Sequence, residues 1–158
     1  MSGWRCLDAF AGSGALGFEA ASRGAAQAVL LERDRKLAAS LEQTRERLRA
    51  ACLHVHNTEA LAWMARCAPE SFELVFIDPP FDSTLLVPAI AAAARLVVPD
   101  GFVYIEAGEA LAPDAQALAG MVLHKQGRAG VVHFHLAQKS AQEIPQEIPQ
   151  EMPQEMPQ

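Results

Sequence analysis

Four residues in the middle of the chain, Asp78-Pro79-Pro80-Phe81, could hold an amine for reaction. The two prolines fix two φ angles and remove two N–H groups, so the Pro79 carbonyl is held rigidly beside the Asp78 carboxylate. Two such acceptors suit an exocyclic –NH₂ group, which has two hydrogens to donate. Phe81 offers a flat face for a base that has left its own stack. These four residues are our candidate catalytic residues, acting by positioning; a rigid turn before a helix N-cap is the alternative.

A second element, Asp8-Ala9-Phe10-Ala11-Gly12-Ser13-Gly14, lies between a short apolar segment and a predicted helix. Gly12 and Gly14 let the backbone approach a ligand closely. With Gly17 they match G-x-G-x-x-G, which fits the pyrophosphate of a dinucleotide or S-adenosylmethionine. Asp8 favours S-adenosylmethionine, because a carboxylate repels pyrophosphate and attracts an ammonium or a sulfonium by about 4 kcal/mol at about 4 Å. Capping of the following turn is the simpler role for Asp8.

Two further acids follow the next predicted strands. Glu32 lies 18 residues after Gly14, a distance at which an acid accepts hydrogen bonds from ribose hydroxyls in both kinds of nucleotide site. A solvated charge is the alternative there. After the third predicted strand, Glu59 could accept the amine of an adenine and the Ala60 N–H could donate to a ring nitrogen. An acid at a helix N-terminus explains Glu59 equally well.

These motifs need a sheet that brings the ends of several strands together. Apolar runs predict strands at 4–8, 28–32, 53–56, 72–77 and 101–106, and periodic segments predict helices at 15–23, 34–50, 58–66 and 84–96. In the second helix, Leu37, Leu41 and Leu48 form the expected inner stripe. Residues 121–125 and 131–136 flank a turn-like stretch at 126–130 and predict a hairpin. The pattern predicts an α/β Rossmann-like fold, with a mostly parallel seven-stranded sheet, a C-terminal antiparallel hairpin strand and helices on both faces.

The 158 residues divide into two parts of different composition. Residues 1–140 form the predicted domain, and 141–158 form a predicted disordered tail in which Gln-Glu-(Ile or Met)-Pro is repeated. The tail holds four Glu and no Lys or Arg. The net charge of −6 therefore falls to −2 for the domain, from 13 basic and 15 acidic residues. This balance argues against binding nucleic acid as a polycation, although one local face remains possible.

The remaining composition indicates a reduced, cytoplasmic protein. Three cysteines without a CxxC pair support neither a disulfide framework nor a zinc site. The sequence has no visible signal peptide and no apolar stretch near the ~20 residues that span a membrane. The pairs His54/His56 and His133/His135 could each be half of a metal site, but surface histidines on a strand are the simpler interpretation, and we expect no metal.

The motifs at 8–20, 31–34 and 76–81 together resemble class I S-adenosylmethionine-dependent methyltransferases. More narrowly, they resemble the RsmD family, which methylates the N2 amine of a guanine in bacterial 16S ribosomal RNA. Val103-Tyr104-Ile105-Glu106 and the segment 125–130 are also similar to that family's later strands and hairpin. The resemblance covers residues 4–138.

The resemblance implies S-adenosylmethionine as cofactor, and 16S rRNA or the assembling small ribosomal subunit as partner of a monomeric enzyme. Glu32 would hold the ribose, Glu59 and Ala60 would flank the adenine, and Asp78 would hold the target guanine beside the cofactor. The remaining expected cofactor contacts are Asp8, Phe10, Ala11, Gly12, Ser13, Gly14 and Arg33. Family members carry a segment rich in Arg and Thr before the first strand, which helps to dock RNA. This chain would then be a fragment, the product of a misplaced start codon or a reduced homologue.

Three other functions stay open at this point. A non-catalytic, methyltransferase-like binding domain would keep the cofactor loop without transferring a methyl group. An amino-methyltransferase acting on another base, such as adenine in DNA, would share Asp78-Pro79-Pro80-Phe81. An NAD-dependent oxidoreductase would explain the glycine loop but has no use for Asp8 or for the amine-holding element.

Overall fold

The computed structural model describes residues 1–81, 83–114 and 116–141. The elements follow one another as β1 (Arg5–Asp8), α1 (Ala15–Ser22), β2 (Gln27–Glu32), α2 (Arg35–Leu48), β3 (Leu53–Asn57), α3 (Ala60–Arg66), β4 (Phe72–Ile77), α4 (Leu86–Leu96), β5 (Val97–Ala107), β6 (Val122–Ala129) and β7 (Val132–Gln138). Every helix and strand expected from the sequence is present, although several ends differ. Apart from residue 141, the predicted tail lies outside the described residues.

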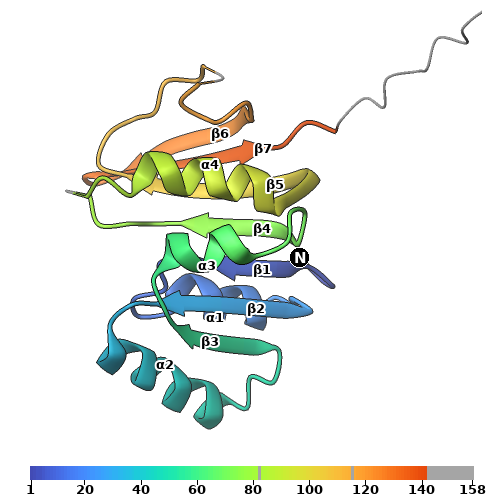
Figure 1. Ribbon diagram of the computed structural model, residues 1–158, viewed down its shortest axis with the longest axis vertical. Coiled ribbons are helices and arrows are strands. Elements are labelled where there is room, and N and C mark those ends of the chain that lie inside the picture. The colour runs from blue at the N-terminus through green and yellow to red at the C-terminus, as the bar shows by residue number, and fades with distance from the viewer. Residues whose placement is uncertain (82, 115, 142–158) are drawn as a thin grey trace, which may run out of the picture.

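The seven strands form one sheet in the order β3-β2-β1-β4-β5-β7-β6 (Figure 1). β1 to β5 run parallel to one another, and β7 runs antiparallel to both of its neighbours, β5 and β6. The prediction of a mostly parallel sheet with an antiparallel C-terminal hairpin is confirmed. The strand order changes direction between β1 and β4, and an open α/β sheet binds its ligand at such a point.

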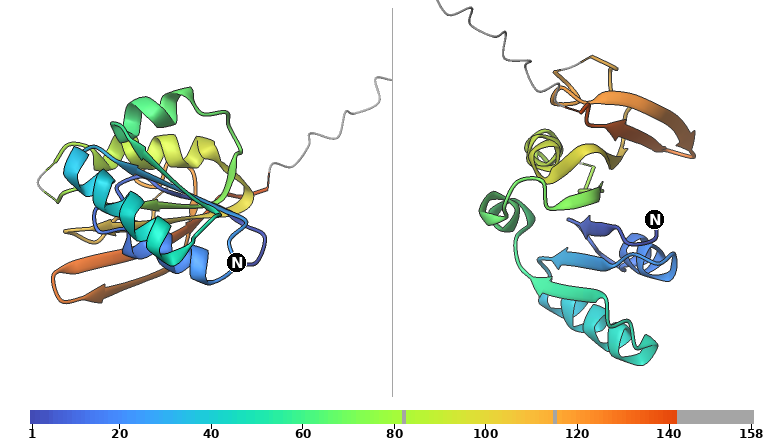
Figure 2. Two further views of the ribbon diagram at one scale, coloured as in Figure 1. Left: turned by 90° about the horizontal axis from the view of Figure 1, so that it is seen from below. Right: turned by 90° about the vertical axis from the view of Figure 1, so that its right-hand side faces the viewer.

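Helices cover both faces of the sheet. In the right-hand view of Figure 2, α3 and α4 lie on one side of the strands and α1 on the other. The largest apolar cluster joins α3 and α4 to the middle strands through residues such as Met64, Ile90, Val75 and Ile105. Because the central strands are covered on both faces, β4 is almost entirely apolar and buried.

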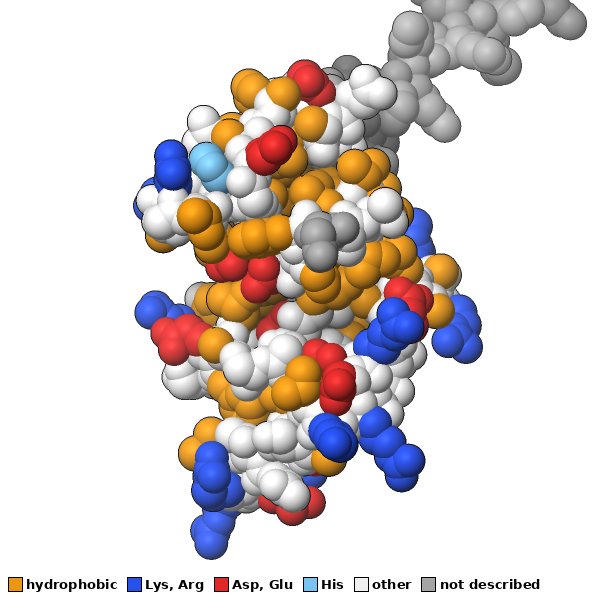
Figure 3. All heavy atoms as spheres, turned by 90° about the vertical axis from the view of Figure 1, so that its left-hand side faces the viewer, with side chains coloured by type: hydrophobic (Ala, Val, Ile, Leu, Met, Phe, Trp, Pro, Cys, Tyr) orange, Lys and Arg blue, Asp and Glu red, His pale blue; other side chains and the backbone are white. Residues whose placement is uncertain are grey.

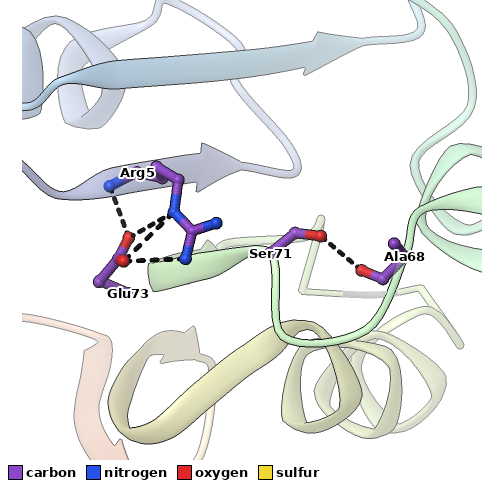
Figure 4. Close-up of polar contacts among 4 residues, drawn as sticks. All are labelled: Arg5, Ala68, Ser71 and Glu73. Carbon is purple, nitrogen blue, oxygen red and sulfur yellow. Dashed lines mark hydrogen bonds and ion pairs between the residues drawn. The ribbon is translucent and has the colours of Figure 1, made fainter.

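Arg5 and Glu73 join the beginnings of β1 and β4 (Figure 4). The Arg5 backbone N–H donates to Glu73 Oε2 at 2.7 Å, and Arg5 Nη2 lies 2.9 Å from Glu73 Oε1. In the loop before β4, the Ser71 hydroxyl donates to the Ala68 carbonyl at 2.6 Å. These contacts lie at the amino ends of the strands, and they support the register that pairs Asp8 with Phe76 at the other end.

Two expectations about packing and turns were wrong. In α2 only Leu41 of the predicted stripe is buried, together with Ala38, whereas Leu37 is 44% and Leu48 59% exposed. The helix lies at the edge of the sheet, so only its central residues reach the strands. In the hairpin, β6 continues through most of the predicted loop, and only residues 130–131 separate it from β7.

Gly127 explains the error in the hairpin. It pairs with Phe134 across the two strands, and a Cβ atom at Gly127 would overlap the Phe134 ring. The glycine thus makes room for an aromatic ring inside the strand, a use of strand glycine that resembles a turn signal in the sequence. No described helix is long and apolar enough to cross a membrane.

Candidate active site

A cavity of about 830 Å³ opens at the carboxyl ends of the parallel strands. Its wall comes from the segments 9–13 after β1, 31–34 around the end of β2, 58–60 after β3 and 78–81 after β4, with Leu37 and Leu85. The volume lies within the range of sites for small molecules and cofactors. Of the predicted site residues, all but Asp8 and Gly14 line it.

The glycine loop shapes one side of this cavity. Gly12 has φ +55° and nothing within 4 Å of where its Cβ would be, so it leaves the cavity open. Gly14 lies behind the wall and caps α1 with φ +83°. A Cβ there would lie 2.5 Å from Leu41 Cδ2. Both positions therefore favour glycine, one for access and the other for backbone conformation and packing.

Glu32 connects the loops that follow β1 and β2. Its Oε2 accepts the Gly12 N–H at 2.8 Å, and its Oε1 accepts the Asp34 N–H at 2.9 Å. Each carboxylate oxygen can accept more than one hydrogen bond, so the side chain retains capacity for the hydroxyl groups of a ribose. Arg33, predicted as a neighbouring contact, also lines the cavity.

Asp8 lies beneath the cavity and is only 2% exposed. Its Oδ2 accepts the Gly17 N–H in the first turn of α1 at 3.1 Å, so it does cap the turn. Its Oδ1 has no hydrogen-bond partner among the described residues. Burial, with smaller contributions from Asp78 and Glu32, raises the pKa of Asp8 to about 7. A nearby positive charge would favour the ionised form of this carboxyl.

Glu59 is the N-cap of α3. Its two carboxylate oxygens accept the N–H groups of Leu61 at 3.1 Å and Ala62 at 2.8 Å. The capping role that the sequence left open is therefore the one that the contacts show. Ala60, the first residue of α3, lines the cavity beside it and brings backbone rather than side-chain groups to this side.

The segment Asp78-Pro79-Pro80-Phe81, predicted to hold an amine, follows β4 directly, as expected. The Phe81 ring is 52% exposed, an unusual amount for a large apolar side chain beside a cavity. The Pro80 carbonyl accepts both the N–H and the hydroxyl of Ser83, which holds the turn after the prolines. Burial, together with the nearby Glu106 carboxyl, raises the pKa of Asp78 to about 6.

Glu106 was not among the predicted site residues. It lies near the end of β5, close enough to Asp78 to help raise the pKa of that carboxyl. Its Oε1 also accepts the Tyr104 hydroxyl at 2.9 Å. Its position after the apolar run of the fifth strand was a usable signal, because β5 is parallel to β4 and ends beside Asp78.

Comparison with known proteins agrees with this arrangement. A family model described as "Conserved hypothetical protein 95" matches residues 1–138. The ribosomal RNA small subunit methyltransferase D of Escherichia coli (strain K12) is 36% identical over 144 residues, covering 87% of this chain and 70% of that protein. The chain belongs to the ribosomal RNA small subunit methyltransferase D family.

Solved structures support the same family and fold. A structure described as "Putative methyltransferase yhhF from Escherichia coli" has a TM-score of 0.78 at 36% identity, and the match covers 89% of this chain and 78% of that one. An S-adenosylmethionine-dependent methyltransferase from Mesorhizobium loti, at 13% identity and a TM-score of 0.65, covers 87% of this chain and 92% of that one, which shows the fold alone. The fold of this family member is therefore the Rossmann-like class I methyltransferase fold.

The histidine pairs lie outside the cavity of this family member. His54 and His56 are exposed on β3, as expected. His135 is buried, contrary to the expectation of a surface residue: its Nε2 accepts the Leu111 N–H at 3.0 Å, and its Nδ1 lies 3.4 Å from the Ile105 carbonyl. Over the described part of the chain, no three His, Cys, Asp or Glu side chains are grouped as a metal site would require.

Proposed function

We propose that this protein transfers a methyl group from S-adenosylmethionine to the exocyclic N2 amine of a guanine in small-subunit ribosomal RNA. The main support is that Asp78-Pro79-Pro80-Phe81 lines the same cavity as Glu32 and the glycine loop at 9–13. The family relation supports the RNA substrate, because the relatives are named ribosomal RNA small subunit methyltransferases.

The residues around the cavity fit S-adenosylmethionine. The unpartnered Oδ1 of Asp8 would be stabilised by a positively charged ligand above it. Glu32 would accept hydrogen bonds from the ribose hydroxyls, and the Ala60 N–H would donate to the adenine. Glu59 would act indirectly, by fixing the first turn of α3 beside the adenine.

The amine would be held by the segment after β4. When bound, S-adenosylmethionine supplies a methyl group attached to a positively charged sulfur. Phe81 would stack on the guanine, while the Asp78 carboxylate and the Pro79 carbonyl accept the two hydrogens of N2. This turns the nitrogen lone pair out of conjugation and towards the methyl carbon. Asp78 would accept the proton that N2 loses on methylation, while the electron pair of the broken C–S bond would remain with the departing cofactor.

The charge distribution at this edge supports an RNA partner in spite of the net charge of −6. Figure 3 looks onto the edge, where Lys and Arg side chains lie around the rim, several of them beside acidic side chains, and acidic and hydrophobic side chains lie near the middle. Basic side chains at the rim suit phosphate groups of an RNA backbone, which supply much of the affinity for nucleic acids. Acidic groups in the middle suit N–H donors of a base and a cationic cofactor.

Binding and activity measurements test the proposal in sequence. Calorimetry should show binding of S-adenosylhomocysteine and none of NAD; tight binding of NAD alone would refute a methyltransferase. Methyl transfer should then be measured on undermodified small-subunit RNA, naked and in assembling particles. Asp78→Ala, which removes the acceptor, should lower kcat/KM at least about 100-fold, the scale of a misplaced reacting group. Glu109→Ala, which removes an exposed acid, is the control and should leave kcat/KM unchanged. Full activity of Asp78→Ala would contradict the role of Asp78 in holding the amine.

A further inference from the structure

A pair of carboxyl groups stands where β4 and β5 end. The register pairs Ile77 with Ile105, so the next residue of each strand, Asp78 and Glu106, brings an acid to the same place. The Glu106 carboxyl lies close enough to Asp78 to help raise the pKa of that acid. Glu106 is also held from its own strand by the Tyr104 hydroxyl at 2.9 Å.

The end of β5 also lies against the exposed ring that would carry the base. A Cβ on Gly108, two residues after Glu106, would be 3.6 Å from Phe81 Cβ. Glu106 is partly exposed rather than enclosed in the core. A base stacked on Phe81 with its amine at Asp78 would therefore have Glu106 beside one edge.

The hydrogen-bonding edges of the four RNA bases differ in the atom next to the amine. Guanine has an N–H group, N1–H, beside its N2 amine, so two neighbouring carboxylates can accept from both. Adenine and cytosine carry a lone pair on the ring nitrogen beside their amines, and an ionised carboxylate only accepts hydrogen bonds. Uracil has no amine. Paired carboxylates therefore match guanine alone among the four.

We propose that Glu106 selects guanine by accepting its N1–H, while Asp78 accepts from the neighbouring N2 amine. Tyr104 is a positioning residue that orients the Glu106 carboxylate. This inference rests on the proposed function and deepens it, because Asp78-Pro79-Pro80-Phe81 alone suits any base amine. Burial and the nearby Glu106 raise the pKa of Asp78 to about 6, so Asp78 retains a proton more readily than an exposed acid would. The two N–H groups of guanine would take the place of that proton.

A substrate with one changed position can test the role of Glu106. 2-Aminopurine keeps the amine at C2 but has a lone pair at N1 and lacks the oxygen at C6. Small-subunit RNA carrying guanine or 2-aminopurine at the methylated position should be compared through kcat/KM for methyl transfer. The missing oxygen affects wild type and variant alike, so a change in the ratio of the two substrates reports on N1.

The wild type should favour guanine over 2-aminopurine by about 100-fold or more, because sites built for a hydrogen bond strongly reject an analogue that lacks it. Glu106→Gln should lower the ratio of kcat/KM for guanine to kcat/KM for 2-aminopurine at least about tenfold. The reason is that an amide can accept from N1–H or donate to the N1 lone pair. Tyr104→Phe should lower this ratio by a smaller factor. Glu109→Gln, an exposed acid on the same segment, is the matched control and should leave the ratio unchanged.

The outcomes separate this inference from the proposed function. If Glu106→Gln lowered kcat/KM equally for both RNAs and kept the wild-type ratio, the selective role would be overturned and Glu106 would be a structural residue. Binding of S-adenosylhomocysteine by the variant would show that its cofactor half is intact. A wild type that binds S-adenosylhomocysteine but methylates no guanine RNA would instead refute the proposed function, and the selection of guanine with it.

Discussion

Replacing the buried Asp8 by asparagine should make the stability of the protein less dependent on pH. The side chain is 2% exposed, and its pKa is raised from 3.8 to about 7, mainly by burial. Between these values the native protein retains a proton that the unfolded chain has lost. The free energy of unfolding therefore falls as the pH rises through this window.

The expected size follows from the displaced titration. A displacement of about three pH units corresponds to about 4 kcal/mol, at about 1.4 kcal/mol per unit. About 3 kcal/mol of this decrease in the free energy of unfolding falls between about pH 5 and pH 8. The rest has already occurred below about pH 5, because the unfolded chain begins to lose the proton at about pH 4. The substitution Asp8→Asn removes the titrating group, but it places an NH₂ group where Oδ1 had no partner. This unsatisfied donor should cost about 1–3 kcal/mol at every pH.

Urea unfolding of the ligand-free protein at about pH 5 and pH 8 measures this difference. The stability of Asp8→Asn relative to wild type should rise by about 3 kcal/mol between the two pH values. Asp100→Asn is the control, since this exposed side chain should give no pH-dependent difference. A difference between Asp8→Asn and wild type that is the same at both pH values would refute the raised pKa and the reasoning based on burial.

Three further substitutions test the scaffold by urea unfolding. Gly14→Ala should destabilise the protein by about 1–3 kcal/mol, because φ is +83° and the new Cβ would lie 2.5 Å from Leu41 Cδ2. Glu59→Ala should cost about 1 kcal/mol through loss of the α3 N-cap; an unchanged stability would contradict that role. Arg5→Ala should cost less than about 1 kcal/mol, and high salt should reduce the effect, since its ion pair with Glu73 is partly exposed.

The sheet could be predicted because parallel strands carry a strong sequence signal. Residues 72–77 are nearly all apolar, as a strand covered on both faces requires. Helical periodicity located α2 but overestimated its buried stripe, since Leu37 and Leu48 are exposed. The period of a helix gives the direction of its apolar face, whereas the extent of contact depends on where the helix lies over the sheet.

The site could be predicted where residues directly follow strands. The carboxyl ends of parallel strands meet at one edge, so Glu32 and Asp78 could be placed together from the chain alone. The depth of Asp8 beneath the cavity could not, because it depends on how α1 packs over β1. The place of Glu106 near the end of the fifth strand could be predicted in the same way, but its position beside Asp78 depends on the register between β4 and β5, which a single sequence does not contain.

The location of the site at the ends of β1 to β5 has a consequence for folding. Its parts extend from the loop after Asp8 to Glu106, so no short contiguous fragment contains them. Parallel pairing closes long loops before it gains contacts, which makes such sheets slow to form. Competence to bind a ligand should therefore arise only after the central strands have assembled. In a refolding experiment, recovery of ligand binding would report the completion of the sheet rather than the appearance of secondary structure.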